Sequence, residues 1–180
     1  MRVWMERLVK KAQNGDKDAF LQLMQEHELA MYRTAKAILH REDDVEDAAQ
    51  EAVCRAFYKI GEVRKPRAFK AWLMRVVINC CYDLLRDQRG IVPLELLPEK
   101  GYTEEWDTAL DVRESLSKLG ENDRLILTLY YLNDLSVRDV AKLLGISEGA
   151  VKQRLVHGRK RFKEAYETRE QEGRAVSYEK

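Results

Sequence analysis

Residues 136–155 have the sequence SVRDVAKLLGISEGAVKQRL, and this stretch determines the fold of the C-terminal part of the chain. Ser136 is of a residue type that caps helices, and the helical spacing of apolar residues after it stops at Gly145. A glycine there supplies the left-handed backbone angle of a tight turn. Ser147 then caps a second helix, whose inner face carries Val151 and Leu155. Two short helices joined in this way form a helix-turn-helix.

The outer face of the second helix is basic and polar. Its side chains have the reach and the donors to contact base edges and phosphates in a major groove. They are Lys152, Gln153, Arg154, His157, Arg159, Lys160 and Arg161. A basic helical face is often only solvated, but this one lies on the element whose geometry suits DNA. The stretch therefore predicts a DNA-binding protein.

The rest of the chain is also predicted to be helical. Only 3 prolines and 9 glycines occur among 180 residues, and no alternating strand pattern is present. Three apolar patterns at helical spacing lie in the N-terminal half of the chain, one after residue 16, one over 45–60 and one over 69–84. Their predicted caps or first-turn residues are Asp16, Asp43 with Asp44, and Pro66. Three such helices can pack as one small bundle.

A segment without helical periodicity separates the two helical parts. It contains Pro93, Pro98 and Gly101 among acidic residues, which is typical of an extended linker. After it, Asn122 is expected to cap a further helix. The predicted fold is all-α, with two small helical domains joined by an acidic linker. The predicted divisions are a first domain over 1–90, a linker over 91–106, a helix-turn-helix domain over 107–168 and a polar tail over 169–180.

Charge is distributed unevenly although the formal net charge is only +1. Residues 59–90 include eight basic and three acidic side chains, and residues 147–163 include six and one. Residues 91–117 between them include two basic and seven acidic side chains. Two basic zones separated by an acidic connector indicate two surfaces that bind a polyanion.

Other classes of protein find little support in the sequence. Cys54, Cys80 and Cys81 form no C-x-x-C pair, and their apolar neighbours predict small core residues. No nucleophile–base pair or glycine-rich phosphate loop occurs, and His27 and His40 lack partners at metal-ligand spacing. We expect no enzyme activity, catalytic residue, metal or cofactor. No apolar run of membrane length or signal peptide is seen, so a cytoplasmic protein is expected.

Three blocks of the sequence resemble the sigma-70 family, especially its extracytoplasmic-function (ECF) group. Residues 135–155 resemble region 4, residues 44–57 (DVEDAAQEAVCRAF) resemble region 2.2, and residues 69–86 (FKAWLMRVVINCCYDLLR) resemble regions 2.3 and 2.4. The similarity covers most of residues 5–165. Three blocks in order and at the right separations are a much stronger signal than a lone helix-turn-helix.

The resemblance implies an alternative sigma factor that binds core RNA polymerase and directs promoter-specific transcription initiation. Implied partners are the clamp helices of the largest polymerase subunit, the flap of the second-largest subunit, promoter DNA and an anti-sigma factor. The family position near the flipped base of the minus-ten element corresponds to Asn79, while Val156 and Gly158 stand where the family often has larger or basic side chains.

The resemblance also implies a role for each matching side chain. Polymerase docking falls to Asp47, Gln50, Glu51 and Arg55. The basic loop 61–66 and the following helix would open and bind the minus-ten element, with backbone contacts from Arg64, Lys65, Arg67, Lys70 and Arg75. The minus-thirty-five element would be read by Lys152, Gln153 and His157, with Arg154, Arg159 and Arg161 on phosphates.

The main alternative is a classical helix-turn-helix regulator with an unrelated N-terminal module. Such a protein binds duplex DNA by itself, usually as a dimer on spaced half-sites. A sigma-like decoy that binds only polymerase would keep the region 2.2 face without a basic recognition helix. The observation that separates these classes is whether specific DNA binding requires core polymerase.

Overall fold

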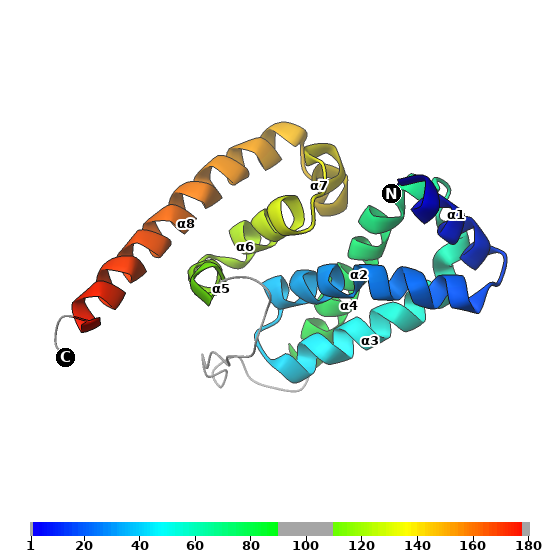
Figure 1. Cartoon of the computed structure of the whole chain (residues 1–180), viewed down its shortest axis with the longest axis horizontal. Coiled ribbons are helices and arrows are strands. Elements are labelled where there is room, and N and C mark those ends of the chain that lie inside the picture. Colours follow the sequence, from blue (N-terminus) through cyan, green and yellow to red (C-terminus); the bar gives the residue numbers. More distant parts are fainter. Residues whose placement is uncertain (1, 90–109, 178–180) are drawn as a thin grey trace. The chain divides into compact units, whose positions relative to one another are not determined.

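The computed structural model describes residues 2–89 and 110–177, and every element within these ranges is helical (Figure 1). The all-α prediction is therefore confirmed. The chain divides into two compact units, Met1–Tyr102 and Thr103–Lys180. The predicted linker, 91–106, lies outside the described residues.

The first unit is a bundle of four helices with two short 3-10 turns. In chain order these elements are α1 (Arg2–Gln13), α2 (Lys17–Ile38), α3 (Glu42–Lys59), η1 (Ile60–Glu62), η2 (Pro66–Ala68) and α4 (Phe69–Arg89). Helices α2, α3 and α4 all pack against one another, and α1 covers α2 and both turns. The fully buried side chains of this core include Val9, Leu23, Ile38, Val45, Phe69, Leu73, Met74 and Val77.

The predicted caps of the first unit are only partly correct. Asp16 caps α2 as expected, because its Oδ1 accepts from the Ala19 amide at 2.9 Å. The prediction that Asp43 and Asp44 cap α3 is wrong, since that helix starts at Glu42 without a side-chain cap. Asp44 is buried instead, and its Oδ1 accepts from Gln88 Nε2 at 2.9 Å. This carboxylate therefore joins the start of α3 to the end of α4 rather than closing a helix end.

Helix α1 precedes every helix that the sequence patterns identified. Its buried residues, Leu8, Val9 and Ala12, recur at helical spacing after the half-buried Met5. That short stripe is the signal that could have revealed the helix.

The second unit contains the helix-turn-helix and the helices that support it. Its elements are α5 (Leu110–Ser117), α6 (Glu121–Leu127), the π turn η3 (Thr128–Leu132), α7 (Val137–Leu144) and α8 (Glu148–Ser177). Helix α8 packs against α5, α6 and α7, and its backbone continues into the polar tail as far as Ser177. The predicted cap at Asn122 is wrong, because α6 begins one residue earlier, with Gly120 at its N-cap.

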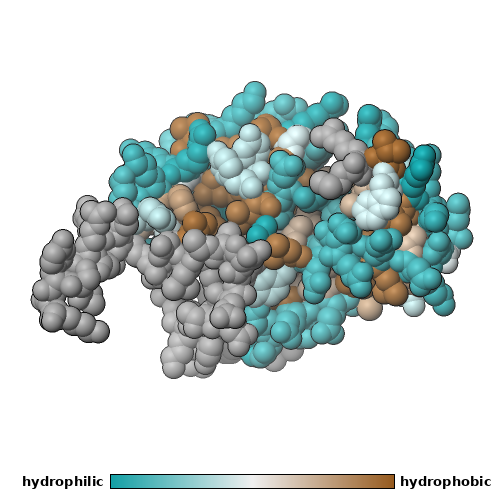
Figure 2. Space-filling view, in the orientation of Figure 1, coloured by the Kyte–Doolittle hydropathy of each residue, from teal (hydrophilic) through white to brown (hydrophobic). Residues whose placement is uncertain are grey.

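Hydrophilic residues dominate the visible surface, in line with a charged fraction of 35%, and hydrophobic residues show between them (Figure 2).

The prediction of three core cysteines holds for Cys80 and Cys81, which are buried. Burial raises the pKa of the Cys80 thiol to about 11, so this thiol stays protonated near neutral pH. The prediction fails for Cys54, which lies exposed on the outer side of α3 beside Phe57. Among the described helices, none has the length and apolar content needed to cross a membrane.

Candidate nucleic-acid interface

The two helices of the helix-turn-helix are capped as their sequence predicts. Ser136 Oγ accepts from the Asp139 amide at 3.1 Å at the start of α7. The same hydroxyl donates to Asp139 Oδ2 at 2.6 Å, which holds the first turn further. Ser147 Oγ accepts from the Ala150 amide at 3.1 Å at the start of α8. Both predicted caps are confirmed.

The turn between α7 and α8 depends on Gly145. This residue has φ 67° and ψ 30°, the left-handed conformation that favours glycine. Its amide donates to the Ala141 carbonyl, and the Ile146 amide donates to the same oxygen at 3.1 Å. The turn thus satisfies the end of α7 and sets the direction in which α8 leaves.

The inner face of α8 holds the helix against the rest of the unit. Val151 and Leu155 are buried, as predicted, and Gly158 continues this face one turn further. A Cβ atom built on Gly158 would lie 3.4 Å from Cγ and Cδ1 of Leu127 in α6. The glycine that the family pattern left unexplained is therefore a close-packing position.

The outer face of α8 presents its predicted DNA-binding side chains to solvent. Four of the predicted DNA-binding residues are exposed within its first three turns, namely Lys152, Gln153, Arg154 and His157. Val156, which the sequence reasoning did not assign to DNA, is 56% exposed one turn after Lys152. A methyl-bearing side chain at that place can contact the methyl group of thymine in a major groove.

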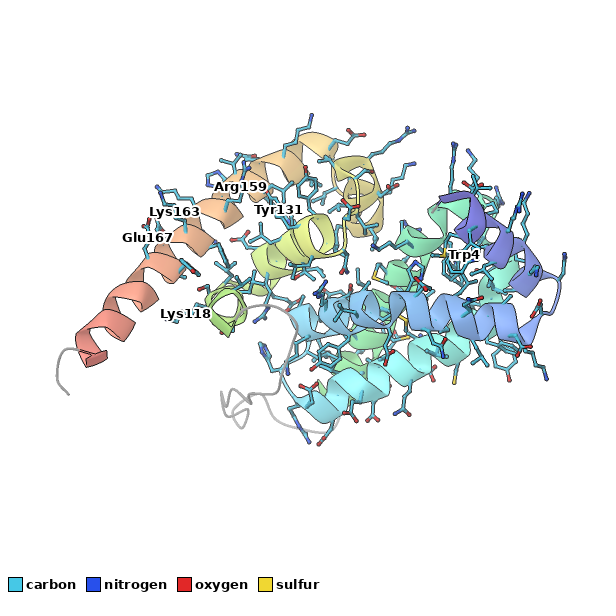
Figure 3. The ribbon with its side chains drawn as sticks, in the orientation of Figure 1. Trp4, Lys118, Tyr131, Arg159, Lys163 and Glu167 are labelled. Atoms are coloured by element: carbon cyan, nitrogen blue, oxygen red, sulfur yellow. The ribbon has the colours of Figure 1, made fainter. Side chains whose placement is uncertain are left out.

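The arginines later in α8 differ from one another. Arg159 is an exposed residue of α8 (Figure 3), and its Nε donates to the Leu155 carbonyl of the same helix at 3.2 Å. Arg161 forms an ion pair with Asp123 of α6, with 2.6 Å between Nη1 and Oδ2. The Asp123 side chain is only 12% exposed, so Arg161 neutralises a largely buried carboxylate. Arg161 consequently supports the position of α8, a role that the sequence did not predict.

The first unit gathers its predicted minus-ten residues around the turn between α3 and α4. Exposed side chains at this turn are Arg64, Lys65 and Arg67. On α4, Arg75 and Asn79 are exposed and lie one turn apart on the same face, whereas Lys70 is half-buried. Tyr82 continues that face and is 41% exposed, and sequence reasoning missed it. Its spacing from Asn79, three residues on a helix, was the available signal.

The aromatic pair Phe69 and Trp72 stands at the start of α4, within the apolar pattern that predicts this helix. Phe69 belongs to the core, since it is 1% exposed and meets the ring of His27 edge-on at 5.4 Å. Trp72 is half-buried, and its ring lies 5.7 Å from that of Phe69.

Burial lowers the pKa of His27, whose Nδ1 lies 2.9 Å from the Leu23 carbonyl oxygen. No cluster of three potential metal-ligating side chains occurs within 2–89 and 110–177.

The predicted docking face on α3 combines exposed and ion-paired side chains. Asp47 and Gln50 are exposed, while Arg55 is bound on both sides by carboxylates. Its Nε lies 2.7 Å from Glu51 Oε1 and its Nη1 lies 2.5 Å from Asp83 Oδ2 on α4. The Arg55 guanidinium holds the pKa of Asp83 below its usual value. Arg55 therefore also fixes α3 against α4.

Family models match both units of the chain. The Sigma-70 region 2 model matches residues 23–91, and the Sigma-70, region 4 model matches residues 109–162. SigM of Mycobacterium tuberculosis, an ECF RNA polymerase sigma factor, is 33% identical over 151 residues, which cover 82% of this chain and 77% of SigM. SigW of Bacillus subtilis, another ECF sigma factor, is 26% identical over 178 residues, covering 88% of this chain and 95% of SigW.

A solved structure agrees with these sequence matches. The structure of CnrH in complex with the cytosolic domain of CnrY superimposes with a TM-score of 0.68 at 27% identity, covering 91% of this chain and 97% of CnrH. The chain therefore belongs to the ECF group of the sigma-70 family, the alternative sigma factors that direct transcription initiation and are not themselves enzymes.

Proposed function

We propose that this sigma factor acts through three surfaces: α8 on the minus-thirty-five element, the α3–α4 turn with α4 on the minus-ten element, and α3 on core polymerase. The observation that carries this division is that each of the two compact units has its own exposed basic surface. One surface lies on a duplex-reading motif, whereas the other surrounds an irregular turn. Two different forms of promoter DNA are therefore suitable ligands.

The surface on α8 suits duplex DNA. Helix-turn-helix docking places the first turns of the second helix deepest in the major groove. Lys152, Gln153 and His157 are exposed there and would contact base edges. Arg154, Arg159 and Arg161 would contact phosphates, the last while it also pairs with Asp123.

The surface around the α3–α4 turn suits separated strands. Its basic side chains would bind single-strand phosphates, and Asn79 would read a base that has left the stack. Phosphate contacts are assigned to Arg64, Lys65, Arg67, Lys70 and Arg75. The exposed ring of Tyr82 on the same α4 face offers a surface on which an unstacked base can lie.

The exposed face of α3 would dock on the clamp helices of the largest polymerase subunit. Asp47, Gln50 and Glu51 supply acidic and amide groups, and Arg55 stabilises this face through its two ion pairs. The second unit would contact the flap of the second-largest subunit. An anti-sigma factor is the expected regulator, a proposal supported by the binding of CnrH to the cytosolic domain of CnrY. A cytoplasmic location is part of this proposal, because core polymerase and promoter DNA are in the cytoplasm of a bacterium.

Footprinting of the holoenzyme on one of its promoters tests the division of labour. Combining Lys152→Ala with Gln153→Ala should remove protection of the minus-thirty-five element. Combining Arg64→Ala with Lys65→Ala should leave that protection in place but reduce permanganate reactivity of thymines near the minus-ten element. Equal effects of both double variants on both readouts would contradict the proposed assignment of surfaces.

A further inference from the structure

The side chain of Gln13 holds the turn that connects α3 to α4. Its Nε2 donates one hydrogen bond to the Ile60 carbonyl at 3.0 Å and another to the Val63 carbonyl at 2.9 Å. These acceptors lie 47 and 50 residues away in the sequence. Because a primary amide has two N–H donors, one side chain binds both the first residue of η1 and the residue directly after it.

The position of Gln13 is itself fixed. It is the last residue of α1, a helix that lies beside η1 and η2 (Figure 1). Leu8, Val9 and Ala12 bury the inner face of this helix. The amide of Gln13 therefore projects from an anchored helix end, not from a loop.

The contact lies directly before the basic part of the turn. Ile60 and Val63 are buried, so their side chains face the core while their carbonyls meet Gln13. Arg64 and Lys65 follow at once and are exposed. No regular helix or strand orders these two residues, since η1 ends at Glu62 and η2 begins at Pro66. The direction in which they leave Val63 thus depends on how firmly that residue is held.

We propose that Gln13 is a positioning residue for promoter opening, which fixes residues 60–63 so that Arg64 and Lys65 are preorganised to bind the separated strand. Binding groups held in place before the ligand arrives lose less conformational freedom on binding. The proposal rests on the proposed role of the α3–α4 turn at the minus-ten element. If it is right, α1 influences promoter opening through Gln13, although no residue of α1 is proposed to contact DNA.

Gln13→Glu is the decisive variant because it keeps the shape of the side chain but replaces the donor nitrogen with an oxygen. A carboxylate there would face two carbonyl oxygens. With the holoenzyme on a mapped promoter, the rate of opening, followed by 2-aminopurine fluorescence in the minus-ten element, should fall roughly tenfold. Affinity for core polymerase and protection of the minus-thirty-five element should not change. Gln13→Lys, which restores donors, should recover most of the rate.

Two further measurements separate positioning from general loss of stability. Asp16→Ala removes the α2 cap in the same unit without touching the turn, and Gln22→Ala changes an exposed glutamine of α2. Both variants should open the promoter at a rate near that of the wild type at temperatures where they are folded. A premelted promoter should remove most of the Gln13→Glu defect, because opening is then no longer required.

Different failures have different meanings. If Gln13→Glu opens the promoter normally while Arg64→Ala with Lys65→Ala slows opening, Gln13 does not position the turn. The rates of Asp16→Ala and Gln13→Glu are to be compared at temperatures equally far below the melting temperature of each variant. If Asp16→Ala then slows opening as much as Gln13→Glu does, the same conclusion follows. If the double variant itself opens normally, the proposed function of the turn is wrong.

Discussion

Gly158 of α8 and Leu127 of α6 approach so closely that a single added carbon on Gly158 would lie 3.4 Å from Cγ and Cδ1 of Leu127. Glycine inside a helix normally costs about 1 kcal/mol relative to alanine. Here its small size lets α8 lie close to α6 just beyond the turns that are proposed to read DNA. The contact therefore helps to set the position of the recognition helix.

Gly158→Leu should lower the free energy of unfolding of the second unit by about 1–3 kcal/mol, because the larger side chain must displace Leu127. Gly158→Ala should change it by less than about 1 kcal/mol, since the added methyl meets Leu127 at contact distance and improves helix propensity. Urea titration followed by circular dichroism measures both values. A leucine variant as stable as the alanine variant would contradict the close packing.

The stability of the first unit should depend on pH through His27. Burial lowers the pKa of this side chain in the folded state, and nearby Lys70 acts in the same direction. Below the ordinary histidine pKa of 6.5, the unfolded chain binds a proton that the folded chain resists. The contribution of neutral His27 to the free energy of unfolding is therefore complete above pH 6.5 and is lost as the pH falls below this value.

His27→Gln should remove this component. The free energy of unfolding should be measured at pH 7.5 and pH 5.5. Its decrease between these two pH values should be smaller for the variant than for the wild type. An equal loss in both proteins would mean that His27 titrates alike in the folded and unfolded states.

Reversing charge on the docking face should weaken binding to core polymerase. Asp47→Lys with Glu51→Lys places two cations where carboxylates are proposed to meet the clamp helices. The exposed changes should cost within about 0.5 kcal/mol of stability. Asp47→Lys alone keeps the pairing of Glu51 with Arg55 and should give a smaller effect in the same direction. Fluorescence anisotropy with labelled protein measures the affinity for core polymerase.

Glu28→Lys is a suitable control, because it makes the same charge change at an exposed site on α2. If this control weakens binding as much as Asp47→Lys, the effect is one of net charge, and the docking face lies elsewhere.

Base reading and phosphate binding on α8 should separate by position. Gln153→Ala should cost about 1–3 kcal/mol at one position of the minus-thirty-five element and relax the preference there. Arg159→Ala should weaken all sequences alike and reduce the salt dependence of binding by roughly one phosphate contact. Holoenzyme binding to a set of single-base promoter variants measures both. Uniform weakening by Gln153→Ala would mean that the helix enters the groove in another orientation.

Arg161 provides an internal comparison for Arg159. Because it already pairs with Asp123, its loss should lower the stability of the second unit by about 1–3 kcal/mol, since the largely buried carboxylate is left without its partner. Arg161→Ala should reduce the salt dependence of DNA binding less than Arg159→Ala does. The reverse order would assign Arg161 mainly to phosphate.

Local features of the structure could be predicted from sequence, and tertiary contacts could not. Ser136, Gly145 and Ser147 act within a few residues of their own positions, so their residue types suffice to predict the turn. Asp44 looked like a cap by the same logic, yet it bonds to Gln88, 44 residues away. A local pattern cannot distinguish these two uses of one carboxylate.

The site residues follow the same rule. Exposure of Lys152, Gln153 and Asn79 could be predicted from helical spacing, because the opposite face of each helix is apolar. Arg55 and Arg161 also join neighbouring helices through ion pairs. These pairs depend on carboxylates 28 and 38 residues away in the sequence. Gln13 gave no sequence signal, since its two acceptors are backbone carbonyls that any residue could supply.

Transcription from genomic fragments is the decisive measurement of sigma-factor activity. The purified chain, core polymerase and genomic DNA would be combined, and transcript start sites mapped with and without the chain. We expect new start sites only when chain and core are both present, preceded by two shared sequence blocks near minus ten and minus thirty-five. Gln153→Ala should shift the preferred upstream block, and Arg64→Ala with Lys65→Ala should reduce the yield of transcripts. Specific protection of duplex DNA by the chain alone, without new start sites when core is added, would contradict promoter recognition through core polymerase.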